Sequence, residues 1–248
     1  MERLAYKLLL AYAGRPFAGW QRQPGRASVQ ETLGGALLRA GLDVSLAAAA
    51  RTDAGVSARR QVVTFRARCR LDGSIVPALN AALPRGVRVL SLTPAPPSFH
   101  ARASARWKEY RYRVRVGPPA CSGAWSVPDP RSLPRLQLPL DLGAARELLA
   151  AQLGRRDRSG FTTRPTGPKE TELIAAELRA PNPGRLLFRF VGGSFTRHLV
   201  RNWVWAAVAR AAGVAADFES PRGWRGPRAP GHGLVLWDVG YDGDPDGS

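Results

Sequence analysis

Residues 50–60 carry the most unusual stretch of the chain, Ala50-Arg51-Thr52-Asp53-Ala54-Gly55-Val56-Ser57-Ala58-Arg59-Arg60. Asp53 is one of only 19 acidic residues in a chain with 37 lysines and arginines, and arginines flank it on both sides. An aspartate followed two residues later by glycine is typical of a turn, because its carboxylate bonds nearby backbone N–H groups. Neighbouring positive charge also keeps a carboxylate ionised, which suits a nucleophile or a base. A structural turn and a reactive carboxylate are both compatible with this stretch.

Strands are expected on both sides of this turn. The segment Leu4–Tyr12 alternates apolar residues, as does Val62–Leu71, and Tyr110–Val116 repeats the pattern further along. In the last two segments the intervening positions are arginines: Arg66, Arg68, Arg70, Arg111, Arg113 and Arg115. Half-buried strands with one cationic face are typical of an antiparallel sheet beside something anionic. A merely solvated face would give the same pattern.

Helices alternate irregularly with these strands. Ser28 and Glu31 form a capping box that predicts a helix ending near Gly41. Further helices are expected over 141–153, after Asp141, and over 194–212, where apolar residues recur at helical spacing. Two more strands are expected over 186–191 and 234–241, with a Pro/Gly-rich linker over 213–233. Because strict β-α-β alternation is missing, the order predicts an α+β fold.

The charge of the chain points to an anionic partner. The 248 residues carry a formal net charge of 37 − 19 = +18, and all basic residues except Lys7, Lys108 and Lys169 are arginines. A GC-rich coding sequence would explain arginine in place of lysine, but it would not explain the excess of positive charge. Nucleic acid is the simplest polyanion that such a chain binds. An acidic membrane surface or a basic structural protein are the alternatives.

Several protein classes are excluded by what the sequence lacks. The longest apolar run, Trp203–Ala209, is far shorter than the roughly 20 residues of a membrane span. Two cysteines rule out a disulfide framework, and three scattered histidines disfavour a metal site. Neither a phosphate-binding loop nor a dinucleotide fingerprint is present. The start Met1-Glu2-Arg3 is unlike a signal peptide, so a cytoplasmic location is expected.

The Asp53 stretch resembles the signature of the tRNA pseudouridine synthase A family, and further family landmarks follow in order over residues 4–241. The landmarks are Gly19-Trp20-Gln21-Arg22-Gln23, Ser28-Val29-Gln30-Glu31, Arg51-Thr52-Asp53-Ala54-Gly55-Val56, Gln61-Val62-Val63, Asn80-Ala81-Ala82-Leu83-Pro84, Phe99-His100-Ala101-Arg102, Lys108-Glu109-Tyr110-Arg111-Tyr112, Phe195-Thr196-Arg197-His198-Leu199-Val200-Arg201-Asn202 and Ala229-Pro230-Gly231-His232-Gly233-Leu234.

The resemblance implies two α+β halves that share a central, largely antiparallel sheet, with a cleft between them. We place the halves at residues 1–103 and 104–241 and expect a disordered tail over 242–248. It also implies a homodimer that binds tRNA, without membrane association, metal or cofactor. The implied reaction converts uridine to pseudouridine at positions 38, 39 and 40 of the tRNA anticodon arm.

The resemblance assigns roles to individual residues. Asp53 takes the position of the catalytic aspartate, Tyr110 that of the tyrosine that stacks on the target base, and Arg201 that of the arginine that pairs with the aspartate. The remaining substrate-binding positions are Gln21, Arg22, Arg51 and Arg102. Without the resemblance, Tyr110 would be interpreted as a core residue and Arg201 as part of a solvated helix face.

These assignments fit the chemistry of the reaction. The enzyme must break the C–N glycosidic bond, turn the uracil and rejoin it to the ribose through C5, with no redox change and no loss of atoms. A carboxylate suits attack on the sugar, attack on the uracil or proton abstraction from the ribose, and the sequence does not choose among these. A base in a stem must also be flipped out, at a cost of a few kcal/mol, which phosphate contacts offset.

Three positions depart from the family pattern. Ser57 stands where the family usually has histidine, the segment 213–233 is short and Pro/Gly-rich, and Arg15-Pro16-Phe17 replaces a polar turn. These departures affect the expected breadth of substrates rather than the catalytic residues. Two other function classes remain as alternatives: an RNA-binding or chaperone protein without turnover, and a glycosidase with two carboxylates about 5–10 Å apart.

Overall fold

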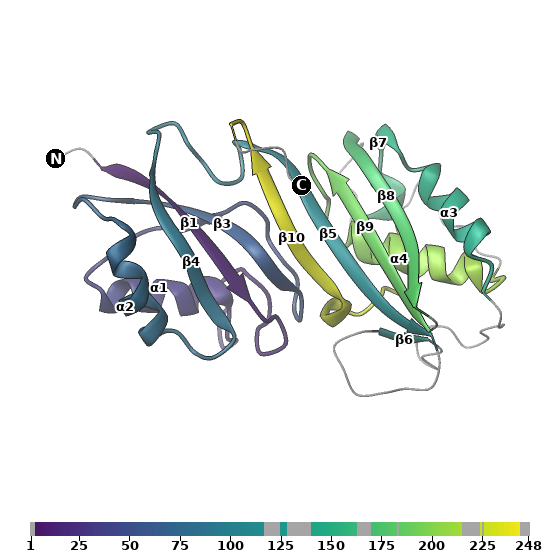
Figure 1. The fold of residues 1–248 in the computed structure, drawn as a ribbon, viewed down its shortest axis with the longest axis horizontal. Helices are drawn as coiled ribbons and strands as arrows, with labels where there is room; N and C mark the ends of the chain where they lie inside the picture. The colour runs from purple at the N-terminus through teal and green to yellow at the C-terminus, as the bar shows by residue number, and fades with distance from the viewer. Residues whose placement is uncertain are drawn as a thin grey trace. The chain divides into compact units, whose positions relative to one another are not determined.

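The computed structural model describes residues 3–116, 125–127, 140–162, 170–182, 184–214, 224 and 226–243. The chain forms two compact units (Figure 1): Met1–Arg106 with Val235–Ser248, and Trp107–Leu234. The sequence-based halves, 1–103 and 104–241, differ from these units mainly in the last strand, which groups with the first unit. Part of the expected linker, residues 215–223 and 225, and residues 244–248 of the expected tail lie outside the described residues.

The first unit contains a sheet in the order β4-β1-β3-β10, with β2 also beside β3. Strand β1 is antiparallel to both β3 and β4, whereas β10 runs parallel to β3. The elements are β1 (Leu4–Tyr12), α1 (Val29–Arg39), β2 (Ala47–Ala48), β3 (Ser57–Ala67), the 3₁₀ turn η1 (Gly73–Ile75), α2 (Val76–Ala82), β4 (Val87–Ala95) and β10 (Leu234–Tyr241).

The strand alternation and the helix cap that the sequence predicts are present in this unit. Alternate residues of β1 from Tyr6 to Tyr12 are buried. The Ser28 hydroxyl caps α1 by accepting from the Glu31 N–H, and Gly41 follows with a positive φ of 79°. Strand β3 starts at Ser57 and stops at Ala67, so the expected strand over 62–71 is displaced toward the N-terminus.

The second unit contains the strand order β5-β9-β8-β7, in which all neighbours are antiparallel, with the short β6 parallel to β5. The elements are β5 (Ala105–Val116), β6 (Trp125–Val127), α3 (Leu142–Ala150), β7 (Gly154–Asp157), η2 (Ser159–Phe161), β8 (Glu170–Asn182), β9 (Arg185–Gly192), α4 (Leu199–Ala211) and η3 (Gly231–Gly233). Together the two units confirm the predicted α+β class with largely antiparallel pairing.

The core of the second unit lies between α4 and one face of the sheet. The Trp203 ring is fully buried and stacks on Phe190 of β9 at 5.6 Å between ring centroids. Phe190 is the register partner of Tyr110 on β5, so Tyr110 shares this inward face. Trp203 and Trp205 are therefore packing residues. Helix α4 begins at Leu199, five residues later than expected, because His198 has a left-handed backbone with φ of 64°.

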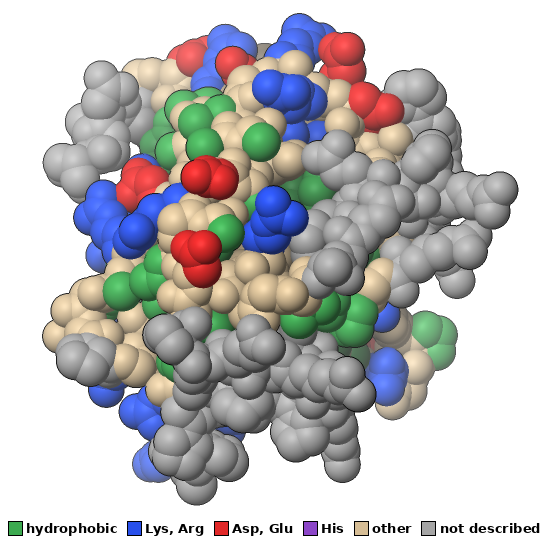
Figure 2. Space-filling view, turned by 90° about the vertical axis from the view of Figure 1, so that its right-hand side faces the viewer, with side chains coloured by type: hydrophobic (Ala, Val, Ile, Leu, Met, Phe, Trp, Pro, Cys, Tyr) green, Lys and Arg blue, Asp and Glu red, His purple; other side chains and the backbone are tan. Residues whose placement is uncertain are grey.

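The surface carries charges of both signs. On the side shown in Figure 2, where β7, β8 and α3 lie in Figure 1, basic and acidic side chains are interspersed among apolar ones. Within the described residues, no helix has the length and apolar character needed to cross a membrane.

Asn80 on α2 covers the outer side of strand β4. Its side-chain amide donates to the Val89 carbonyl at 2.9 Å, and its carbonyl oxygen accepts from the Val89 N–H at 2.8 Å. The outer N–H and C=O groups of a strand at the end of a sheet otherwise offer a pairing site to another chain. This pair of hydrogen bonds explains why an asparagine stands in the Asn80-Ala81-Ala82-Leu83-Pro84 landmark.

Replacing Asn80 with alanine is expected to lower the free energy of unfolding by about 1–3 kcal/mol, because both Val89 backbone groups lose their partner. Urea unfolding measures the change. Asn182→Ala, at an exposed asparagine at the end of β8, is the matched control and should change stability by less than about 0.5 kcal/mol. Equal effects of the two substitutions would contradict this role of Asn80.

Candidate active site

Asp53 lies in a tight loop whose backbone is fixed by the preceding Gly19–Trp20 segment. Gly19 and Asp53 form an isolated antiparallel bridge, and the Trp20 N–H donates to the Thr52 carbonyl at 3.0 Å. Within the loop, the Val56 N–H donates to the Asp53 carbonyl at 3.1 Å, and Gly55 has a positive φ of 78°. Asp53 is half-buried, and it is carried by a backbone that these bonds fix.

Two glycines allow the backbones to approach this closely. A Cβ on Gly14 would lie 2.2 Å from the Val56 carbonyl oxygen, and a Cβ on Gly19 would lie 2.6 Å from the Thr52 oxygen. Gly19 also has φ of 111°, which L-residues rarely adopt. The Gly14 N–H donates to the Ser57 hydroxyl at 3.0 Å. Ser57, which stands where the family usually has histidine, therefore helps to hold the same contact.

A buried polar network supports the residues just before Asp53. The Gln61 side chain donates to the Ala50 carbonyl at 2.7 Å and accepts from the Ala50 N–H at 3.2 Å. The Tyr12 and Thr52 hydroxyls are 2.7 Å apart, and Gln61 also donates to the Tyr12 oxygen at 3.4 Å. Because buried polar groups are costly without partners, these bonds hold residues 50–52 in one conformation.

Sequence reasoning assigned no role to Tyr12 or Gln61. A signal was present, since Gln61 interrupts the apolar positions of its strand and is fully buried. A glutamine at a core-facing position must satisfy both its carbonyl and its amide inside the protein. That requirement predicts a neighbouring backbone partner, which the structure shows to be Ala50.

Three of the other predicted binding residues lie near the Asp53 loop in sequence or through backbone pairing. Arg51 is exposed two residues before Asp53, and Gln21 and Arg22 are exposed immediately after the Gly19–Trp20 segment. The backbone N–H of Arg22 donates to the Gln30 side chain at 3.1 Å, which ties it to α1. The side chains of Arg51, Gln21 and Arg22 are thus exposed on backbone that lies next to the Asp53 loop.

Arg102 lies elsewhere in the first unit. Its neighbour Ala101 accepts a hydrogen bond from the Tyr241 hydroxyl and donates its N–H to the Thr64 hydroxyl, both at 2.7 Å. Thr64 pairs with Lys7, which lies on the opposite face of β1 from Tyr12. The two hydrogen bonds of Ala101 fix the backbone next to Arg102, whose side chain is exposed.

Tyr110 and Arg201 belong to the second unit and share its inward face. Tyr110 is 7% exposed, and its ring meets Phe195 edge-on at 5.0 Å between centroids. The Arg201 Nε donates to the Ala229 carbonyl at 2.6 Å, while the neighbouring Tyr112 hydroxyl donates to the Pro230 carbonyl at 2.7 Å. These two hydrogen bonds hold residues 229–230 beside the Arg201 and Tyr112 side chains.

Tyr112 and Gly233 explain the last sequence landmark. A Cβ on Gly233 would lie 2.5 Å from the Tyr112 ring, so only glycine fits there. Burial raises the pKa of Tyr112 well above its ordinary value, although the positive charge of Arg201 opposes the shift. Tyr112 is thus a neutral hydrogen-bond donor at physiological pH. The described residues contain no group of three or more His, Cys, Asp or Glu side chains that could hold a metal ion.

Two relatives of this chain from different bacteria carry the same name. It is 36% identical over 258 residues to the tRNA pseudouridine synthase A of Thermus thermophilus, covering 97% of each protein. It is 35% identical over 261 residues to the protein of the same name from Methylobacillus flagellatus, covering 94% of this chain and 92% of the relative. The chain belongs to the tRNA pseudouridine synthase A family.

Two further comparisons add no functional argument. No family profile matches the chain. Among solved structures, a chain of a Cbf5–Nop10–Gar1 complex aligns with a TM-score of 0.42 and 12% sequence identity, over 95% of this chain and 50% of that one. Family membership rests on the sequence relatives.

Replacing Gly19 with alanine is expected to destabilise the protein by about 1–3 kcal/mol, because the new Cβ meets the Thr52 oxygen and φ is unfavourable. Gly25→Ala is the matched control, since Gly25 also has a positive φ, 67°, but has open space around its Cβ position. Thermal unfolding of both variants separates backbone strain from the steric clash. A loss in Gly19→Ala no larger than in Gly25→Ala would contradict the close-approach argument.

Stability at alkaline pH is expected to depend on Tyr12. Burial raises the pKa of Tyr12 to about 12, with the hydrogen bonds from Thr52 and Gln61 partly opposing the shift. An unfolded tyrosine ionises near pH 10, so the contribution of neutral Tyr12 is complete below about pH 10 and is lost as pH rises from about 10 to 12.

Denaturant unfolding of the native protein and Tyr12→Phe between pH 8 and 12 checks this expectation. At neutral pH the variant should be less stable by about 1 kcal/mol, because Thr52 and Gln61 lose a partner. Above about pH 10 the difference should shrink or reverse, since phenylalanine has no proton to lose. Parallel stability curves over the whole range would exclude a raised Tyr12 pKa.

Proposed function

We propose that this protein is a tRNA pseudouridine synthase that converts uridine to pseudouridine at positions 38, 39 and 40 of the anticodon arm. Membership in the tRNA pseudouridine synthase A family is the observation that carries the proposal. The rigid presentation of Asp53 supports it, because a group that reacts with a bound nucleotide must be held in a fixed place. A tRNA substrate also implies a cytoplasmic protein.

In this proposal the Asp53 carboxylate starts the reaction as a nucleophile or as a base. The glycosidic bond between C1′ and N1 breaks, the uracil turns while it stays bound, and a bond forms between C1′ and C5. The proton on C5 is lost and N1 gains one, so atoms and electrons balance without a cofactor. Ionised carboxylate is needed in either role.

Tyr110 and Arg201 have supporting roles in the proposal. Tyr110 covers the detached base and limits its escape, and Arg201 pairs with the Asp53 carboxylate. The hydrogen bond from Arg201 Nε to the Ala229 carbonyl supports the second role, because it fixes the plane of the guanidinium group. Arg51, Gln21, Arg22 and Arg102 are proposed to bind the RNA, and the protein is proposed to act as a homodimer.

Replacing Asp53 with asparagine is expected to reduce pseudouridine formation by at least about 10²-fold, the low end of what one acid–base group contributes. The assay uses an unmodified tRNA transcript with uridines at positions 38–40, carbodiimide adducts and primer-extension stops. Asp43→Asn is the matched control, because Asp43 is an exposed loop residue of the same unit with the same charge.

Binding of the same transcript, measured in parallel, decides between the proposal and its alternative. Asp53→Asn should bind RNA nearly as well as the native protein, since the chemistry and not the affinity depends on the carboxylate. RNA binding by the native protein without any stops across several transcripts would favour the noncatalytic RNA-binding alternative. Equal activity of Asp53→Asn and Asp43→Asn would exclude Asp53 as the catalytic residue.

A further inference from the structure

The second unit has a charged sheet face that the proposed reaction does not use. Along β5, Tyr110, Tyr112 and Val114 are buried on the inward face, so the intervening residues point to the other side of the sheet. These outward residues are Glu109, Arg111, Arg113 and Arg115. The register with β9 adds Arg189 and Arg185, and the register with β8 adds Glu177 and Arg179.

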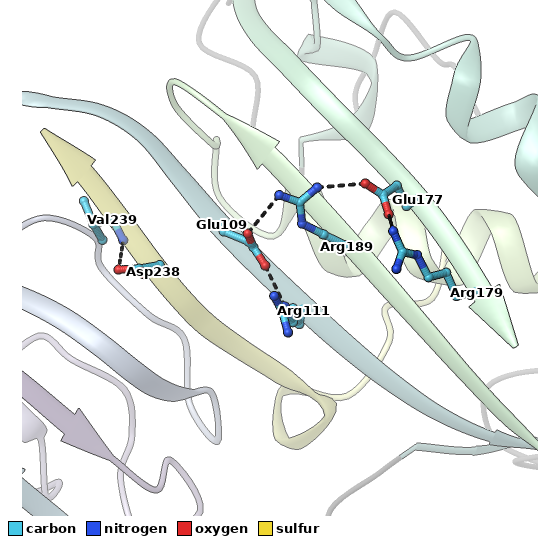
Figure 3. A network of polar contacts seen from close by, with 7 residues as sticks. All are labelled: Glu109, Arg111, Glu177, Arg179, Arg189, Asp238 and Val239. Atoms are coloured by element: carbon cyan, nitrogen blue, oxygen red, sulfur yellow. Dashed lines mark hydrogen bonds and ion pairs between the residues drawn. The ribbon is translucent and has the colours of Figure 1, made fainter. Parts of the chain in front are cut away.

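At one end of this face, acidic residues neutralise the arginines. Arg111 and Arg189 lie directly opposite each other on neighbouring strands. Glu109 joins them, at 2.6 Å to Arg111 and 3.1 Å to Arg189. The Glu177 carboxylate in turn lies between two arginines, 2.7 Å from Arg189 and 2.6 Å from Arg179 (Figure 3). The five side chains form a chain of alternating charge, which we call the charge ladder.

The pKa values of the ladder agree with this interpretation. Burial alone would lower the pKa of Arg189, but its hydrogen bonds to Glu109 and Glu177 outweigh burial and raise it. Burial likewise acts to raise the pKa of Glu177, and the hydrogen bonds from Arg189 and Arg179 outweigh it and lower it. Their partners in the ladder thus stabilise the charged forms of Arg189 and Glu177.

At the other end of the face, two arginines are again directly opposed, but no described glutamate or aspartate forms an ion pair with them. Arg115 and Arg185 also lie directly opposite each other, and Arg113 lies two residues from Arg115 on the same side of β5. Among the described residues, no carboxylate forms an ion pair with any of these three arginines. Like charges directly opposite on neighbouring strands are destabilising. We call these three residues the arginine patch.

We infer that the arginine patch binds the phosphate backbone of RNA. A guanidinium group matches phosphate with two parallel hydrogen bonds, and an anion placed between Arg115 and Arg185 would do what Glu109 does between Arg111 and Arg189. Arg113 and Arg185 are exposed, so an RNA can reach them. The net charge of +18 favours a polyanion over a small ion.

The patch contributes to affinity and not to the chemical step. It lies on the opposite side of β5 from Tyr110, so it contacts a part of the RNA away from the base that Tyr110 is proposed to cover. The inference rests on the proposed function, since the RNA is taken to be its tRNA substrate. Phosphate contacts carry no sequence information, and the patch therefore serves different tRNAs equally.

The test compares two triple variants with the same loss of charge. Arg113→Gln/Arg115→Gln/Arg185→Gln removes the patch, and Arg155→Gln/Arg156→Gln/Arg210→Gln removes three exposed arginines from β7 and α4 of the same unit. Fluorescence anisotropy with a labelled, unmodified tRNA transcript measures Kd at salt concentrations from about 50 to 200 mM.

The patch variant is expected to bind at least tenfold more weakly than the native protein. The slope of log Kd against log salt concentration should fall by about 2, because two or three phosphate contacts are lost. The control should bind within about threefold of the native protein with an unchanged slope. The single-turnover rate of pseudouridine formation at saturating RNA should be the same in all three proteins.

Three results would overturn the inference. The two variants could weaken binding equally, which would show a general charge effect. The patch variant could keep full affinity while sedimentation shows a changed oligomeric state, which would make the face a contact between copies. It could also unfold at a lower temperature than the native protein, whereas removal of opposed like charges should leave or raise Tm.

The same measurements separate this inference from the proposed function. If the native protein forms no pseudouridine but binds the transcript through the patch, the proposed function fails and the binding surface stands. If pseudouridine forms and the patch variant binds as the native protein does, the inference alone fails.

Discussion

The close approach of two backbone stretches, 14–19 and 52–56, is the constraint on which the candidate active site depends. Gly14 and Gly19 permit it because a side chain at either position would overlap the facing carbonyl oxygen. The buried Tyr12, Thr52 and Gln61 side chains then fix the segment that precedes Asp53. The conformation of the Asp53 loop thus depends on residues that lie before it in the chain or on neighbouring strands.

Much of the fold follows from local sequence patterns. The alternation in β1 and β5 and the capping box of α1 predict these elements because burial and capping act over a few residues. Strand β8 lacked such a signal, since only some of its alternate positions are buried, as at Thr171 and Leu173. Helix α4 was expected too early, because Phe195 fits the helical spacing although the left-handed His198 lies between it and the helix.

The candidate site was predictable to a different degree. The Asp53 loop follows from its sequence landmark, whereas the support from Tyr12 and Gln61 depends on contacts across 40 and 49 residues. Arginine alternation likewise could not distinguish the charge ladder from the arginine patch. The strand register together with the ion-pair distances shows which arginines contact an acid.

The chain order of the two units has a consequence for synthesis. Strand β10 is made last, yet it pairs with β3 in the first unit, where the Tyr241 hydroxyl also bonds the Ala101 carbonyl. Domains commonly fold while the ribosome still extends the chain. Here the unit that carries Asp53 cannot be completed until residues 234–241 emerge, so the described strands of the other unit leave the ribosome first. Synthesis of the Asp53 unit thus starts before that of the other unit and ends after it. A nascent chain that stops before residue 234 would lack the β10 strand of the Asp53 unit.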